Sequence, residues 1–193
     1  MAKNTSHFGF FSRVPCRVGI SEQDSLREFI QVVEVCEKLG YDAIWIGEEH
    51  YEPGIFISGA NFILAMACAA KTSRIRIGIA VVAIPLSDPL RIAEMAATVD
   101  QLSGGRLEFG AGRSSNIDAY LSSGLDYSES RGRQIEGIEV ILKAWQNDRF
   151  SHKGRYYQYI DTALAPKPLQ YPHPPVYVAA SSIETYEIAG FAG

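Results

Sequence analysis

Residues 88–113, DPLRIAEMAATVDQLSGGRLEFGAGR, limit the possible folds of this chain more than any other segment. Asp88 can cap a helix whose first turn holds Pro89, and Gly104 with the glycine after it ends that helix. Apolar residues at three- and four-residue spacing predict one buried stripe along it: Ile92, Ala93, Ala96, Val99 and Leu102. Because one flat stripe suits packing on a sheet, we expect a parallel sheet beneath this helix.

The same segment ends in a predicted strand, 106–110, that is followed by Ala111, Gly112 and Arg113. Glycine lets a ligand approach the backbone closely, and arginine supplies a permanent positive charge. We therefore expect a ligand site to begin at this strand end.

Strand and helix patterns alternate along the rest of the chain. Apolar, β-branched or aromatic runs predict strands at 7–11, 43–46, 75–84 and 176–179. Helical spacing predicts helices at 22–39, 60–71 and 129–146, and a last helix that begins at Ser181 and Ser182. Leu39 belongs to the predicted stripe of the first helix, and Ile135 to the inward face of the third. The remaining segments predict a long polar loop after Arg113 with a single helical turn, and a hairpin at 149–160.

Two architectures have this alternation, an open doubly wound sheet and a (β/α)8 barrel. An open nucleotide-binding sheet usually carries a glycine-rich phosphate loop after its first strand, but residues 7–15, HFGFFSRVP, contain no GxGxxG. Polar residues instead follow strands two, four and five, which is typical of a barrel. A full barrel takes ~250 residues, so we expect a single domain, residues 1–193, that forms the N-terminal portion of a TIM (β/α)8 barrel cut short after strand five.

The composition is that of an ordinary soluble globular chain, with 47% hydrophobic residues and a net charge of -4. The mild acidity argues against a nucleic-acid partner, and the apolar runs are too short to span a bilayer. No leader peptide is recognisable in MAKNTSHFGFF, so we expect the cytoplasm. The three cysteines are widely spaced, which predicts reduced thiols and no metal site.

Several segments, in this order, resemble the luciferase-like flavin monooxygenases, the family that includes the bacterial luciferase subunits. They include GYDAIWIGEEHY (40–51), AAKTSRIRIGIAVVAIPLSDPLRIAE (69–94), DQLSGGRLEFGAGR (100–113) and PPVYVAASSIETYEIAG (174–190). The resemblance covers nearly all of the chain. It implies a TIM barrel that binds reduced FMN at the carboxyl ends of its strands.

The resemblance also implies which residues contact the cofactor. Arg113 matches the arginine that holds the flavin phosphate, and a guanidinium suits a dianionic phosphate. The segment that completes the phosphate cradle corresponds to Ser181, Ser182 and Thr185. The pair that luciferase joins by a non-proline cis peptide bond near the flavin ring corresponds to Ala80 and Val81.

Three positions depart from luciferase. Glu49 stands at the first position of its histidine pair and His50 keeps the second. Gly112 replaces a reactive cysteine next to the flavin, and Ser181 replaces a glutamate. Light emission from an aldehyde is therefore not expected, while monooxygenation is. His50 or Glu49 is the expected catalytic residue, able to carry a proton to or from oxygen or substrate.

Structural roles compete with these assignments. Arg113 can instead pair with Asp118 or Glu129, and His50 can simply brace its loop beside a solvated Glu48–Glu49 pair. The aromatic residues of the first strand can wall the cavity or belong to the core: Phe8, Phe10 and Phe11. The other histidines are interpreted as surface or hairpin residues: His7, His152 and His173.

Three functions stay open. The first is a monooxygenase that takes reduced FMN from a flavin reductase and oxygenates a small organic substrate. The second is an oxidoreductase of the same superfamily that uses F420. The third is a non-catalytic flavin-binding or interaction protein derived from a shortened barrel.

Strands one and five would have open edges in such a shortened barrel. A second chain, further residues of a longer polypeptide, or exchange between two copies can cover them. We therefore expect a homo- or hetero-oligomer.

Overall fold

The computed structural model describes residues 7–180, 186 and 190. Five strands in this part of the chain form a parallel sheet in the order β1-β2-β3-β4-β7. Their bounds are β1 Gly9–Ser12, β2 Ala43–Ile46, β3 Arg76–Ala83, β4 Leu107–Gly112 and β7 Val176–Val178. All five predicted strands are therefore present, with β1 and β7 at the two edges of the sheet.

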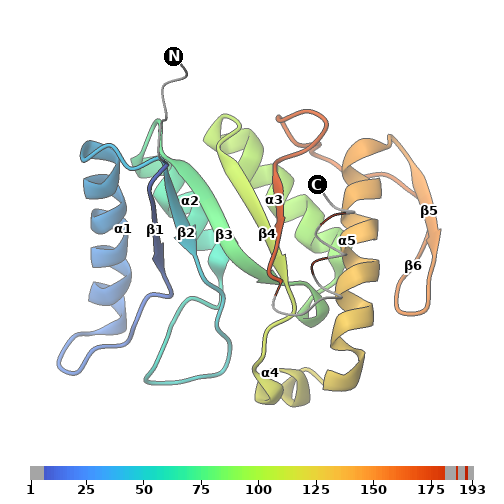
Figure 1. The fold of residues 1–193 in the computed structure, drawn as a ribbon, viewed down its shortest axis with the longest axis horizontal. Coiled ribbons are helices and arrows are strands. Elements are labelled where there is room, and N and C mark those ends of the chain that lie inside the picture. Colours follow the sequence, from blue (N-terminus) through green and yellow to red (C-terminus); the bar gives the residue numbers. More distant parts are fainter. Residues whose placement is uncertain (1–6, 181–185, 187–189, 191–193) are drawn as a thin grey trace.

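Four long helices alternate with these strands: α1 Glu22–Lys38, α2 Asn61–Lys71, α3 Pro89–Ser103 and α5 Ser130–Gln146. Figure 1 shows α2 and α3 behind the sheet, with α1 and α5 at its two sides. Strand side chains in the core between sheet and helices are fully buried, among them Ile44, Ile77 and Phe109. The described residues thus build a wall of parallel strands with helices on its outer face, as in a TIM barrel.

Helix α3 begins and ends where the sequence predicts. The Asp88 carboxylate accepts hydrogen bonds from the backbone N–H groups of Leu90 and Arg91, at 2.9 and 3.0 Å. Gly104 at the other end has φ 70°, in the left-handed region that glycine adopts without strain.

Three residues predicted to face inward are exposed instead. Leu102 is 67% exposed, and Leu39 and Ile135 are exposed too. Leu39 follows the last residue of α1 as its C-cap, so it lies beyond the buried stripe. Leu102 and Ile135 lie at the margin of their stripes, where a step of three residues rotates a side chain past the edge of the packed face.

The inner face of the sheet, opposite the helices, is partly built from glycine. A Cβ at Gly78 of β3 would lie 2.2 Å from the Trp45 ring, and one at Gly9 of β1 would lie 3.0 Å from it. The Trp45 side chain therefore lies across both strands that flank β2. Its ring meets Tyr177 of β7 edge-on, with the ring centroids 5.2 Å apart.

The segment after β4 has more structure than the predicted polar loop. It contains the helix α4 Ile117–Ser122 and the 3-10 turn η2 Tyr127–Glu129. Another 3-10 turn, η1 Ile84–Leu86, lies elsewhere in the chain, between β3 and α3. Asn116 caps α4 by accepting a hydrogen bond from the backbone N–H of Ala119, at 3.2 Å. This segment therefore holds a defined position beside the end of β4.

The predicted hairpin is present as β5 Phe150–Lys153 and β6 Gln158–Thr162, packed outside α5 (Figure 1). His152 lies in this hairpin, one of the two places predicted for it, but it is not a surface residue, since it is only 8% exposed. Its Nε2 lies 3.2 Å from the Glu136 carboxylate of α5. The same carboxylate accepts a hydrogen bond from the backbone N–H of Tyr157 at 2.7 Å. Glu136 of α5 therefore anchors the hairpin, and the helix covers His152 at this point.

Candidate functional site

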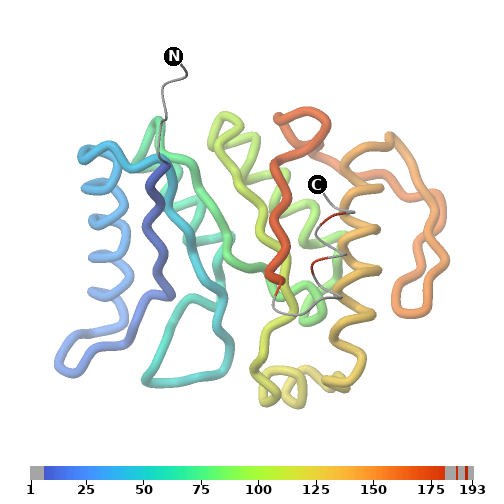
Figure 2. The backbone as a smooth tube through the Cα atoms, in the orientation of Figure 1, coloured from blue at the N-terminus to red at the C-terminus, as the bar shows by residue number. Residues whose placement is uncertain are grey.

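Two of the predicted functional segments meet at the carboxyl edge of the sheet. Figure 2 shows this edge at the bottom of the molecule, where the loop after β2 and the segment after β4 emerge. Asn116 is the residue before α4, and its backbone N–H donates a hydrogen bond to the Ser114 hydroxyl at 3.1 Å. Its side-chain amide donates to the His50 carbonyl at 3.0 Å. The β2 and β4 loops are therefore joined directly, as the carboxyl ends of parallel strands allow.

A carboxylate and a histidine form a close pair in the loop after β2. The Nε2 atom of His50 lies 2.6 Å from Oε1 of Glu48. The Glu48 side chain is only 8% exposed, and its other oxygen accepts a hydrogen bond from the Asn61 amide at the start of α2. The hydrogen bond that the imidazole donates to Glu48 raises the pKa of His50, against the opposing effect of burial. This pair can therefore hold a proton on the imidazole and release it.

The neighbouring carboxylate, Glu49, has a different partner. Its Oε1 accepts a hydrogen bond from Nη1 of Arg13 at 2.8 Å, and Arg13 in turn lies over the Phe56 ring at 4.4 Å. Glu49 is thus engaged in an ion pair with the loop after β1. The acidic partner of His50 is Glu48, which the sequence suggested only as half of a solvated pair.

A signal for Glu48 was available in the sequence. Glu48 comes two residues after the end of β2, beside Gly47, and Asn61 is the first residue of the next helix. Both positions belong to the carboxyl edge in any parallel β/α unit, so a buried polar contact between them is an expected pairing.

Arg113 follows β4 directly and is held by hydroxyl groups. Its Nη1 donates to the Tyr127 phenol at 3.2 Å and to the Ser130 hydroxyl at 3.1 Å. The guanidinium carbon also lies 5.5 Å from the centre of the Tyr127 ring, within cation–π range. Among the described residues it makes no ion pair with Asp118 or Glu129, and Glu129 pairs with Arg133 at 2.8 Å instead.

The strands beside Arg113 pack closely, and the Ala80–Val81 pair is joined as the resemblance implies. The Ala80–Val81 peptide bond is cis, within an irregularity in the pairing of β3 with β4. A Cβ at Gly110 would lie 2.2 Å from the Ile79 carbonyl oxygen, and one at Gly112 would lie 2.1 Å from the Val81 side chain. Only glycine fits at these two positions, because the Ile79 carbonyl and the Val81 side chain occupy the space that a side chain would need.

Two sets of predicted residues have other outcomes. Ser181, Ser182 and Thr185 lie outside the described residues, so their part in the phosphate cradle stays a prediction. The three aromatic residues in and just before β1 have different environments. Phe10 packs against the core, while Phe8 and Phe11 are exposed.

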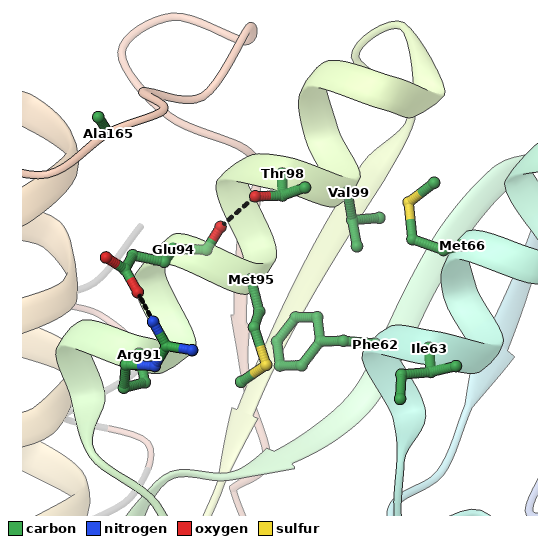
Figure 3. Close-up of a pocket in the computed structure, with 9 residues that line it drawn as sticks. All are labelled: Phe62, Ile63, Met66, Arg91, Glu94, Met95, Thr98, Val99 and Ala165. Atoms are coloured by element: carbon green, nitrogen blue, oxygen red, sulfur yellow. Dashed lines mark hydrogen bonds and ion pairs between the residues drawn. The ribbon is translucent and has the colours of Figure 1, made fainter.

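The cavities near these residues lie among the helices. One of about 490 Å³ lies between α2 and α3, with Phe62, Ile63 and Met95 on its wall (Figure 3). A smaller one, about 140 Å³, shares these three side chains and is also lined by Glu48, His50 and Asn61. The carboxylate–histidine pair therefore borders a space that reaches toward the outer helical layer.

Two other kinds of feature are missing from residues 7–180, 186 and 190. No three histidine, cysteine or acidic side chains in this part gather as a metal site would require. No helix there has the length and apolar character needed to cross a membrane. The three cysteines are free thiols, as predicted.

The fold and the site define a class of protein: a β/α-barrel wall whose carboxyl edge carries an arginine, closely packed glycines and a carboxylate–histidine pair. The family model described as luciferase-like monooxygenase matches residues 6–193, and the chain belongs to this family of oxidoreductase enzymes. The resemblance stated from the sequence is thereby confirmed.

The named relatives include both flavin-dependent and F420-dependent enzymes. The chain is 34% identical over 164 residues to the oxygenase component of flavin-dependent trigonelline monooxygenase from Acinetobacter baylyi, covering 84% of this chain and 45% of that protein. It is 31% identical over 180 residues to F420-dependent glucose-6-phosphate dehydrogenase from Amycolatopsis mediterranei, covering 90% and 53%. The chain thus spans about half the length of these relatives.

The structural comparison gives the same result. Monooxygenase RslO1 from Streptomyces bottropensis superimposes with a TM-score of 0.87 at 26% identity, covering 91% of this chain and 54% of that one. The parallel α/β architecture is therefore shared with this solved monooxygenase.

Proposed function

We propose that this chain is the flavin-binding part of a monooxygenase that uses reduced FMN and O2 to oxygenate a small organic substrate. The observation that carries this proposal is Arg113, fixed at the end of β4 beside the glycine backbone of Gly110 and Gly112. A dianionic phosphate suits the arginine, and the two glycines let β3 and β4 pack closely beside it.

The described residues fit FMN in this arrangement. Arg113 would hold the phosphate, with Ser181, Ser182 and Thr185 as the further ligands that the resemblance implies. Gly112 and the Ala80–Val81 bond would lie beside the ring system. When bound, reduced FMN supplies the electrons that activate O2, and the protein supplies orientation and a site from which water is excluded.

His50 is the proposed catalytic residue of this site. Its imidazole, paired with Glu48 at 2.6 Å, can keep a proton at a pH where an isolated histidine has lost it. Glu49, the other residue proposed from the sequence, would act through its ion pair with Arg13, which holds the β2 loop in place.

The proposal includes a flavin reductase as the partner that delivers reduced FMN. Support comes from the relative named as the oxygenase component of a two-part enzyme. We also propose that the chain is a single barrel domain whose edge strands, β1 and β7, are covered by further residues or by a second chain.

A second candidate is an oxidoreductase that uses F420, since a relative with this cofactor is 31% identical over 180 residues. F420 also carries a phosphate, so Arg113 alone does not separate the two cofactors. The choice between them requires a direct comparison of their affinities.

Flavin titration tests the proposal. We expect FMN to bind at micromolar concentration, and we expect Arg113→Ala to weaken it by roughly tenfold or more, because a charge-assisted hydrogen bond to the phosphate is lost. Arg27→Ala, which removes an exposed arginine paired with Asp24 at 3.6 Å, is the control.

Three outcomes would change the proposal. Equal FMN affinity in the Arg113→Ala variant would contradict the phosphate anchor. Tighter binding of F420 than of FMN would support the second candidate. Binding of FMN by the protein without oxidation of any substrate, in the presence of a reductase and NADH, would indicate a non-catalytic flavin-binding protein.

A further inference from the structure

The segment between β4 and α5 contacts Arg113 from several directions. Its contacts begin with Tyr120 in α4, whose hydroxyl donates a hydrogen bond to the backbone carbonyl of Arg113. Tyr120 is fully buried, and this burial raises the pKa of its phenol to about 12. The phenol therefore stays a neutral donor across the physiological range, and it fixes the backbone from which the arginine side chain departs.

The guanidinium group itself is held by two further residues. Nη1 donates to both the Tyr127 phenol and the Ser130 hydroxyl, and the Tyr127 ring faces the guanidinium carbon at 5.5 Å. Ser130 is 2% exposed, so its hydroxyl is not displaced by competing water. Three contacts thus converge on a single side-chain nitrogen and its plane.

The two tyrosines also support each other. Their rings meet edge-on, with the centroids 5.0 Å apart and the planes at 88°. An edge-on pair of this kind restricts both rings. The contacts to backbone and side chain of Arg113 therefore belong to one packed unit of Tyr120, Tyr127 and Ser130, which we call the arginine clamp.

The clamp engages one edge of the guanidinium and leaves the other. Among the described residues, no hydrogen bond is made by Nε or Nη2 of Arg113, while Nη1 makes two. The Nε–Nη2 edge is the part of arginine that binds a phosphate with two parallel hydrogen bonds. Fixing Nη1 in advance lowers the side-chain entropy that is lost when that edge binds its ligand.

We propose that Tyr120, Tyr127 and Ser130 are positioning residues that preset Arg113 for the phosphate of the bound cofactor. This inference rests on the proposed function and deepens it. It assigns a role to the segment 114–130, whose sequence indicated only a polar loop. The clamp acts on the phosphate alone, so its loss should affect FMN and leave riboflavin, which has no phosphate, unchanged.

The test compares FMN and riboflavin affinities in matched variants. Tyr127→Phe removes the hydroxyl that accepts from Arg113 and keeps the aromatic ring. Ser130→Ala removes the other hydroxyl acceptor. We expect each to weaken FMN by roughly three- to tenfold with riboflavin affinity unchanged. In an Arg113→Ala background, Tyr127→Phe should have no further effect, because the clamp then has nothing to hold.

The control is Tyr156→Phe. Tyr156 also lies under an arginine, with the Arg133 guanidinium carbon 4.9 Å from its ring, but it is not among the contacts of Arg113. Its variant should bind both flavins as the unchanged protein does. Thermal unfolding of every variant separates a loss of affinity from a loss of folding.

The results distinguish the two levels of the hypothesis. If Arg113→Ala weakens FMN while Tyr127→Phe and Ser130→Ala do not, the clamp is wrong and the phosphate anchor stands. Equal losses of FMN and riboflavin in the clamp variants would overturn it too, since they indicate a general structural defect. If Arg113→Ala changes neither affinity, the proposed function fails together with the clamp.

A measurement without flavin gives an independent readout. Nuclear magnetic resonance relaxation of the Arg113 Nε–H group in the ligand-free protein should show a rigid side chain. The same group should become mobile in the Tyr127→Phe, Ser130→Ala double variant. A mobile Arg113 in the unchanged protein would contradict the clamp directly.

Discussion

The two edges of the parallel sheet use their half-buried arginines in different ways. At the amino edge, the Arg106 guanidinium donates five hydrogen bonds, among them one to the Ser103 carbonyl at 2.7 Å and one to the Ala69 carbonyl at 2.9 Å. At the carboxyl edge, Arg113 uses one nitrogen on two hydroxyl groups, and the described residues leave its other edge without a hydrogen bond. Complete pairing indicates a role in stability, and incomplete pairing at a strand end indicates a place for a ligand.

Asp100 shows the amino-edge pattern most clearly. It is fully buried in the last turn of α3, where a negative charge is disfavoured by the helix dipole. Its carboxylate accepts the backbone N–H groups of Leu169 and Gln170, at 2.8 and 2.9 Å, and the Gln170 side chain at 2.7 Å. These hydrogen bonds attach the segment that leads into β7, so we assign Asp100 to the folding of the sheet.

The largest effect that we expect in this comparison comes from Asp100→Ala. A fully buried carboxylate and the three hydrogen bonds that it accepts are lost, which should lower the free energy of unfolding by about 3 kcal/mol. Chemical denaturation measures this loss. Arg27→Ala, which removes only the exposed partner of Asp24, should stay within about 0.5 kcal/mol of the unchanged protein. Comparable losses in the two variants would remove the distinction between the edges.

A smaller loss is expected from Gly78→Ala on the inner face. The new Cβ would lie 2.2 Å from the Trp45 ring, so the indole has to move away from β3 and from Tyr177. Overpacking of this kind should lower the free energy of unfolding by about 1 to 3 kcal/mol. Near-ultraviolet circular dichroism of the aromatic groups should change as well, and an unchanged spectrum with full stability would show that the inner face has spare room.

Glu48→Gln should have the smallest effect on stability and the clearest effect on titration. The Glu48 carboxylate raises the pKa of His50 in the folded protein, so its contribution to stability is present below the unfolded histidine pKa of about 6.5. That contribution is lost as the pH rises through the folded pKa. We therefore expect Glu48→Gln to lower the His50 pKa, and to destabilise the protein more at about pH 5.5 than at about pH 8.5.

Titration of the His50 ring proton resonances checks the first part, and denaturation at the two pH values checks the second. Glu49→Gln is the matched control, because Glu49 acts on His50 only through space and pairs with Arg13. If the His50 pKa falls as far in Glu49→Gln as in Glu48→Gln, then Glu48 is not the specific partner of the histidine.

Much of the fold could be predicted because its signals are local. The cap at Asp88, the stop at Gly104 and the apolar spacing between them are all contained within one helix. The five strands are short, β-branched or aromatic runs separated by such helices, so their order and parallel direction follow from connection lengths.

The features that escaped prediction depend on distant residues. His152 is buried because Glu136, sixteen positions earlier, meets it across α5. Asp100 is satisfied by a segment about seventy residues further on. Glu48 could be separated from Glu49 only when their partners, His50 and Arg13, were placed on opposite sides of the β2 loop. No periodicity in the sequence encodes such pairings.

The position of Trp45 has an optical consequence. The chain has two tryptophans, and the sheet separates them. Trp45 lies on the inner face across Gly78, while Trp145 of α5 packs edge-on against Phe109 in the core on the other side, at 5.2 Å. A chromophore that settled on the inner face would quench the first indole more strongly than the second. Trp45 could therefore serve as a fluorescence reporter of binding on the inner face, with Trp145 as an internal reference in the same protein.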